Sequence, residues 1–167
     1  YPLQRKSHNH EACKLLFQRE GVPDIMVMDG AQSQVGKEFQ KVLKDAGVQC
    51  KRTKPHTPHQ NGCEGFIREI KRGVAREMVK SKAPKQLWDH CLEREALIRS
   101  HTARDDARLA GEVPETIVKG ETADISALAC FEWYEWVKFR DTKAGYPEDT
   151  IQLGRDLGPS IDHGPAM

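Results

Sequence analysis

The 167-residue sequence has no long hydrophobic run and few aromatic residues, which make up 7% of the chain. No apolar stretch approaches the roughly 20 residues that a membrane-spanning helix needs, and no secretory leader is visible at the start. Hydrophobic residues account for 38% and charged residues for 31%, a balance typical of a soluble globular protein with one core. The composition therefore predicts a protein without a membrane partner.

The cysteines are scattered along the chain. The five cysteines are odd in number and show no disulfide-framework spacing, so we expect reduced thiols in an intracellular protein. Cys50, His56, His59 and Cys63 can be interpreted as a zinc site, but their spacing matches no common structural zinc pattern. Cys63 beside Glu64 has no evident His–acid pair to activate it, which favours a packed or idle thiol over a nucleophile.

Charge is unevenly distributed, although the formal net charge is only +1. Residues 51–82 carry nine Lys and Arg against three Glu, a local net of +6. Residues 104–167 carry seven against thirteen Asp and Glu, a net of −6. A concentrated positive charge is typical of surfaces that contact a phosphate backbone. A solvated helix face with incidental charge is the alternative.

The first part of the chain predicts a helix and a strand. Asn9 is expected to cap a helix over residues 10–20, whose apolar stripe consists of Ala12, Leu15, Leu16 and Phe17. Gly21 ends that helix, because glycine suits the position after a helix. The short apolar run 25–28, bounded by turn residues, predicts a buried strand.

Asp29 follows this strand at its carboxyl end, where ligands gather in open α/β sheets. A plain Asp-Gly turn with Gly30 is the competing interpretation. The pattern of residues 35–46 predicts a helix that ends at Gly47, and residues 48–53 predict a partly exposed strand. A strand–helix–strand order then leads into a proline-rich loop.

The helix that begins near Gly62 has two distinct sides. One arc carries apolar residues (Phe66, Ile67, Ile70, Val74 and Met78). The other carries an acid in the first turn and cations in the turns that follow (Glu64, Arg68, Lys71, Arg72 and Arg76). Asn61 and Glu64 also fit a capping box, a competing role for this acid.

The remainder predicts a helix over residues 86–104, one helical turn over 114–119, and strands from Phe131 onward, where the sequence becomes aromatic and alternating. Residues 145–159 are expected to be rich in loop. The three tryptophans are interpreted as core residues rather than base-stacking platforms (Trp88, Trp133 and Trp136).

The proline-rich loop and its acid resemble a known family. Pro55-His56-Thr57-Pro58-His59-Gln60-Asn61, then Glu64 and a basic helix, is similar to the catalytic core of copia-type retroelement integrases. Residues 122–126, 131–135 and 153–158 resemble the region that follows such cores. The resemblance implies an α/β fold, an RNase H-like mixed sheet flanked by helices, with a small C-terminal β appendage. It divides the chain into a partial core (1–105), a connecting segment (106–128) and a β-rich region (129–167).

The resemblance also implies catalytic residues. In the family three acids, the DDE triad, hold two Mg²⁺ ions, and Asp29 matches the second acid and Glu64 the third. The first acid is expected on a strand before Tyr1, so we expect no strand transfer by this chain alone. Between Asp29 and Glu64 lie 34 residues, one fewer than is usual in the family. The loop and basic helix are implied to bind DNA (Gln60, Asn61, Arg68, Lys71, Arg72 and Arg76).

The sequence therefore favours a fragment of a retrotransposon integrase that binds DNA and, when complete, catalyses metal-dependent DNA integration. The expected partners are element ends, target DNA and further copies of the chain, with action in the nucleus. A cut-and-paste transposase and a decayed, non-catalytic DNA-binding remnant are the alternatives. If the chain is an integrase fragment, the carboxylates of Asp29 and Glu64 should lie within about 8 Å of each other, the separation that one pair of metal ions allows.

Overall fold

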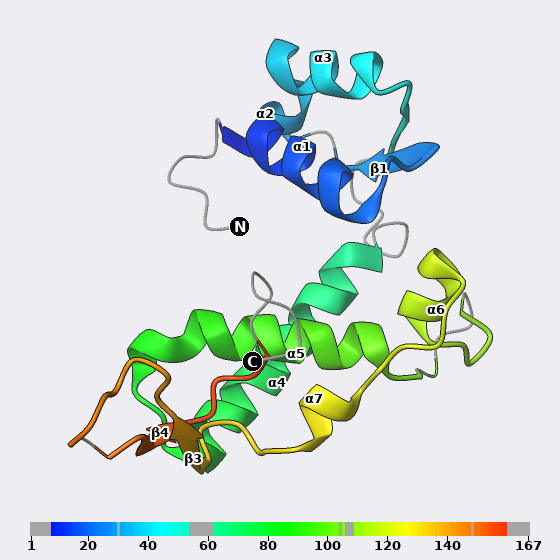
Figure 1. The fold of residues 1–167 in the computed structure, drawn as a ribbon. Coiled ribbons are helices and arrows are strands. Elements are labelled where there is room, and N and C mark those ends of the chain that lie inside the picture. The colour runs from blue at the N-terminus through cyan, green and yellow to red at the C-terminus, as the bar shows by residue number, and fades with distance from the viewer. Residues whose placement is uncertain are drawn as a thin grey trace. The chain divides into compact units, whose positions relative to one another are not determined.

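The structure is a computed structural model that describes residues 8–29, 31–53, 62–103, 105, 109–147 and 149–159. It combines helices with small sheets (Figure 1) and divides into two compact units, Tyr1–Phe66 and Ile67–Met167. In the described residues, each unit contains one two-stranded sheet. No helix among those residues is both long and apolar enough to cross a membrane. The chain is thus of mixed α and β structure, as its sequence predicts.

The first unit is built on a parallel strand pair, β1 (Ile25–Met28) and β2 (Gln49–Arg52). Parallel strands need a long crossover connection, and two helices supply it, α2 (Gln32–Val35) and α3 (Lys37–Asp45). Helix α1 (Asn9–Glu20) packs against α3. The predicted strand–helix–strand order is confirmed.

The core of this unit lies between the two packed helices and one side of the strands. Leu43 of α3 is only 1% exposed, and five residues form the buried cluster (Cys13, Met28, Phe39, Leu43 and Val48). The other side of β1 is open, because Ile25 and Val27 are 43% and 55% exposed. The prediction of a buried strand is therefore wrong for this side of β1.

Two helix predictions in this unit need correction. The helix expected over 35–46 is present as α3, but the preceding helix α2 was not predicted; Gly36 between them is extended, with φ −57° and ψ 144°. His8, not Asn9, is the residue before α1, and the His8 side chain makes no capping hydrogen bond. Leu15 and Leu16 are exposed, because α1 turns Cys13 and Phe17, four residues apart, to the core.

The second unit is mainly helical. Helix α4 (Gly62–Ser81) enters it, and a 3₁₀ turn (Lys85–Leu87) leads into α5 (Trp88–His101). The short helices α6 (Pro114–Lys119) and α7 (Ser126–Ala129) follow. Proline at the first position of α6 and Gly120 in the left-handed region after it explain why that helix is one short segment.

The unit ends in the predicted β appendage, an antiparallel pair of β3 (Trp136–Arg140) and β4 (Ile151–Arg155). Residues 145–159 were expected to be rich in loop, and the structure adds β4 within them, with turn and irregular residues on either side in the part that it describes. Of the three tryptophans, only Trp133 is buried, at 3% exposure; Trp88 and Trp136 are 57% and 56% exposed. The prediction that Trp88 and Trp136 are core residues is therefore wrong.

Helices α4 and α5 meet at a glycine. The Glu95 carboxylate of α5 covers the backbone of Gly73, a buried residue of α4, so closely that a Cβ there would lie 2.7 Å from Glu95 Cδ. Arg99 Nε lies 3.5 Å from Glu95 Oε2, and Arg99 Nη2 donates a 3.2 Å hydrogen bond to the Glu69 carbonyl of α4. Because Glu69 faces Arg99 while Gly73 faces Glu95, the two helices run in opposite directions.

We predict that Gly73→Ala is less favourable than the same change at Gly65. Nothing lies within 4 Å of a Cβ at Gly65, so Gly65→Ala should stabilise the helix by about 0.5–1 kcal/mol. At Gly73 the new methyl group must displace the flexible end of the Glu95 side chain from Arg99, which should offset part or all of that gain. Urea unfolding followed by circular dichroism measures both; equal stabilisation by the two substitutions would contradict the close contact.

Candidate nucleic-acid interface and catalytic acids

The predicted basic side of α4 is on the surface. All four cations are exposed (Arg68, Lys71, Arg72 and Arg76). At about 100° per residue they lie roughly 60–160° around the helix from Gly73, the residue that contacts α5. Arg72 Nη1 donates a 3.1 Å hydrogen bond to Glu69 Oε1. An exposed ion pair of this kind contributes little to stability, so it leaves Arg72 able to exchange partners.

The predicted apolar side of α4 is only partly buried. Ile67 is 52% exposed, although it was expected to pack with Phe66 and Ile70. Ile67 lies about 120° from Gly73 around the helix, whereas Phe66 and Ile70 lie within about 60°. The buried side of α4 is therefore centred on Gly73, a residue that carries no hydrophobic signal in the sequence.

Glu64 lies in the first turn of α4, as predicted, and is exposed. A carboxylate here is favoured by the positive end of the helix dipole. Gln60 and Asn61, with the rest of the proline-rich loop, lie outside the described residues. The capping box and the DNA contacts expected of Gln60 and Asn61 therefore stay predictions.

Asp29 lies at the carboxyl end of β1, as predicted, and is exposed. Beside it at this edge of the sheet lies Thr53, whose N–H donates a 2.9 Å hydrogen bond to the Met28 carbonyl. Asp29 Oδ1 accepts a 3.0 Å hydrogen bond from the N–H of Ala31. That bond, two residues ahead, is an Asx-type turn, so Asp29 has a local structural role whatever else it does.

Metal binding by Asp29 and Glu64 stays a prediction. Carboxylate oxygens suit Mg²⁺, and the bond to Ala31 uses only part of the acceptor capacity of Asp29. In the part of the chain that the structure describes, no three or more His, Cys, Asp or Glu side chains group so that they could hold a metal ion. The interpretation of a zinc site depends on His56 and His59, which lie outside that part.

The cysteines show no sign of nucleophilic chemistry. All five are free, and Cys91 is 1% exposed in α5. Burial raises the pKa of the Cys91 thiol to about 11, with a further contribution from the nearby Glu95 and Glu77 carboxylates. Cys91 therefore stays protonated at neutral pH. Cys63, beside Glu64, is exposed.

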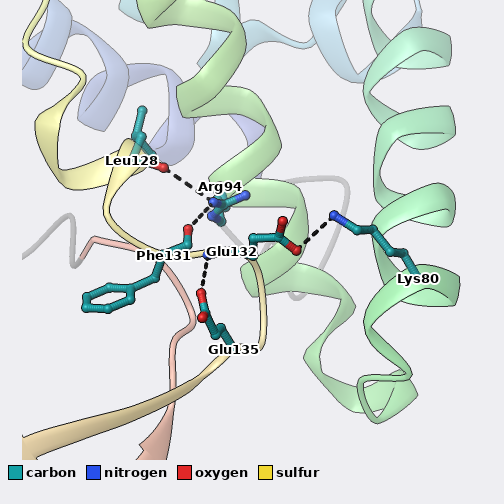
Figure 2. A network of polar contacts seen from close by, with 6 residues as sticks. All are labelled: Lys80, Arg94, Leu128, Phe131, Glu132 and Glu135. Atoms are coloured by element: carbon teal, nitrogen blue, oxygen red, sulfur yellow. Dashed lines mark hydrogen bonds and ion pairs between the residues drawn. The ribbon is translucent and has the colours of Figure 1, made fainter.

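The second unit contains a polar hollow that the sequence did not predict. A cavity of about 360 Å³ opens between α4, α5 and the chain around Phe131. Figure 2 shows its polar network: Arg94 Nη2 donates hydrogen bonds to the Phe131 carbonyl (2.9 Å) and the Leu128 carbonyl (3.4 Å), and Lys80 Nζ lies 2.9 Å from Glu132 Oε2. The Lys80 hydrogen bond lowers the pKa of the Glu132 carboxyl group.

These contacts fasten the segment before β3 onto the helices. The backbone N–H of Glu132 donates a 2.9 Å hydrogen bond to Glu135 Oε2, and a Cβ at Gly158 would lie 3.3 Å from Arg94 Cδ. Arg94 of α5 therefore contacts the chain on both sides of the hairpin, at Phe131 before β3 and at Gly158 after β4. No sequence pattern marks Arg94 for this role, because its partners are backbone groups more than 30 positions away along the chain.

Comparisons with known proteins give a likeness of fold. No protein-family model matches the sequence, and no curated protein matches it. Among solved structures, the chain is similar to a chain of the simian T-cell lymphotropic virus intasome in complex with PP2A regulatory subunit B56 gamma. The TM-score is 0.58 at 13% identity, over 74% of this chain and 44% of that chain. The present chain thus matches less than half of the length of that neighbour.

We predict that the variants Asp29→Asn and Asp29→Ala distinguish the contribution of the Asp29–Ala31 hydrogen bond to stability from that of the Asp29 charge. The Asn side-chain oxygen can still accept the Ala31 N–H, so Asp29→Asn should change the free energy of unfolding by less than about 0.5 kcal/mol. Asp29→Ala removes the acceptor and should cost about 0.5–1.5 kcal/mol. Denaturant titration and hydrogen exchange at the Ala31 amide measure both effects. Equal destabilisation by the two variants would show that the turn needs the ionised acid.

Proposed function

We propose that this chain is part of an integrase-type core that binds DNA and, when complete, catalyses metal-dependent DNA integration. The observation that carries the proposal is the exposed basic side of α4. Its cations come directly after an acid, Glu64, in the first turn of the helix. The likeness of fold to a chain of a viral intasome supports it, and so does the similarity of the proline-rich loop to copia-type integrases. The RNase H-like fold and the DDE assignment belong to the same proposal.

DNA binding follows from the charge on α4. Four cations point to solvent within three helical turns, and residues 51–82 carry a net charge of +6. Cations on a surface of this kind bind phosphates and release condensed counterions, which gives affinity with little sequence preference. The expected ligand is therefore the backbone of duplex DNA.

The catalytic part of the proposal rests on Asp29 and Glu64. Each is an exposed acid, one at the carboxyl end of a parallel strand and one in the first turn of a helix. Two Mg²⁺ ions held by such acids would stabilise charge on the attacking and leaving oxygens of a phosphodiester. The role of this chain is to present the carboxylates and, through α4, to hold the DNA backbone beside Glu64.

A non-catalytic DNA-binding protein is the second candidate. The observation that favours it is the Asp29–Ala31 hydrogen bond, which gives Asp29 a structural reason to be present. The two candidates predict different activities for a core that also contains the strand expected to carry the first acid. Joining of DNA ends that requires Mg²⁺, Asp29 and Glu64 supports the integrase proposal, and a complete core that binds DNA without joining supports the second candidate.

We predict that Arg68→Ala combined with Lys71→Ala weakens duplex binding and lowers its salt dependence. Two lost phosphate contacts should reduce the slope of log affinity against log salt by about two. Fluorescence anisotropy with a labelled duplex of random sequence, titrated across a range of salt concentrations, measures both quantities.

The matched control is Lys37→Ala combined with Lys44→Ala, which removes the same charge from exposed positions of α3. The control variant should bind with nearly the affinity and salt slope of the unmodified chain. If both double variants lower the slope equally, the net charge of the chain drives binding and α4 is not the interface.

A further inference from the structure

The β3–β4 hairpin has two sides of different composition. The register pairs Trp136 with Arg155, and directly opposed residues share one side of an antiparallel pair. We name this side the aromatic–basic face; it consists of Trp136, Lys138, Arg140, Ile151, Leu153 and Arg155. On the opposite side the Phe139 ring covers Gly154, so that a Cβ there would lie 3.0 Å from Phe139 Cε1.

The aromatic–basic face combines cations with exposed apolar surface. It carries three cations and no acid, within a region, residues 104–167, whose net charge is −6. Trp136 and Leu153 are 56% and 60% exposed. Lys138 and Arg140 are exposed, and neither forms an ion pair with another described residue. No acid of this region lies on this face, so Lys138 and Arg140 are available to bind an anion.

The aromatic part of the face is held in place before any ligand arrives. The Arg155 guanidinium carbon lies 3.6 Å from the centroid of the Trp136 ring and 4.5 Å from that of Tyr134. Arg155 Nη1 donates a 2.8 Å hydrogen bond to the Tyr134 carbonyl. Tyr134 has φ +62°, and its N–H donates a 2.9 Å hydrogen bond to the Asp156 carbonyl. A ligand that stacks here does not have to order these groups.

We propose that the aromatic–basic face binds single-stranded nucleic acid. Bases stack on the indole of Trp136 beside the Arg155 guanidinium, and the phosphates lie against Lys138 and Arg140. These two cations are two residues apart on one strand, about 7 Å, so they follow the path of an extended backbone. Base stacking on an aromatic ring beside a row of cations is how proteins bind single strands without sequence preference.

A single strand fits this face better than a duplex. In a duplex the bases are stacked on one another, so Trp136 and Leu153 would meet only the charged backbone. In a single strand the base surfaces are accessible and cover the apolar side chains. The proposal is independent of duplex binding by α4, since it rests on a different element and a different part of the ligand.

The test is anisotropy of the full chain with labelled oligothymidylate, with Trp136→Ala and Trp88→Ala as a matched pair. Both tryptophans are more than half exposed, but Trp88 lies on α5. Loss of base stacking should weaken binding roughly five- to 100-fold in Trp136→Ala, and not in Trp88→Ala. Trp136→Phe, which retains an aromatic ring, should recover most of the affinity.

The charged residues are tested with Lys138→Ala combined with Arg140→Ala. This variant should lose oligothymidylate affinity and salt slope, and should bind duplex DNA as the unmodified chain does. The Arg68→Ala and Lys71→Ala variant should show the reverse, which separates this face from α4. Unchanged oligothymidylate binding in Trp136→Ala would overturn the proposal. Equally effective competition by polyglutamate of the same charge would overturn it too, since it would indicate an acidic protein partner.

Discussion

The contact between Gly73 of α4 and Glu95 of α5 determines which side of the long helix faces solvent. Only glycine lets the Glu95 carboxylate lie directly on the α4 backbone, where Arg99 holds it and bonds to the Glu69 carbonyl. A carboxylate that is 14% exposed needs such a partner, because burying an unpaired charge is costly. With this side of α4 packed, Arg68, Lys71 and Arg72 point away from α5, and Arg76 lies at the exposed border of the packed side.

The same unit presents a second cationic surface by different means. On α4 the exposed side is set by helix packing, whereas the hairpin is fastened by the bonds from Arg94 to the Leu128 and Phe131 carbonyls and by the Trp133 side chain, which is 3% exposed. Helical cations spaced by a turn suit a phosphate backbone. A flat strand pair with an indole suits unpaired bases. The two proposals therefore assign duplex DNA to α4 and single-stranded nucleic acid to the hairpin.

Much of the fold follows from local sequence signals. Gly21, Gly47 and Gly120 mark helix ends, and the alternating aromatic run marks the hairpin, because glycine and side-chain alternation act over a few residues. Helix α2 was missed, since residues 32–35 contain only one apolar residue and show no helical spacing. The buried side of α4 was also missed in part, because Glu95, more than 20 positions away, decides it. The exposure of Trp136 was missed for a similar reason: its ring packs against Arg155, which comes from the opposite strand.

In the proposed function, Asp29 and Glu64 act together at one metal site beside the DNA. Paramagnetic broadening by Mn²⁺ tests it directly, with the amide resonances of Ala31 and Gly65 as reporters, one beside each acid. The account predicts that both resonances broaden together at the same Mn²⁺ concentration, and that Asp29→Asn weakens the broadening at both. Broadening at only one of them, or an Asp29→Asn effect confined to Ala31, would contradict a shared site and leave α4 as a DNA-binding helix alone.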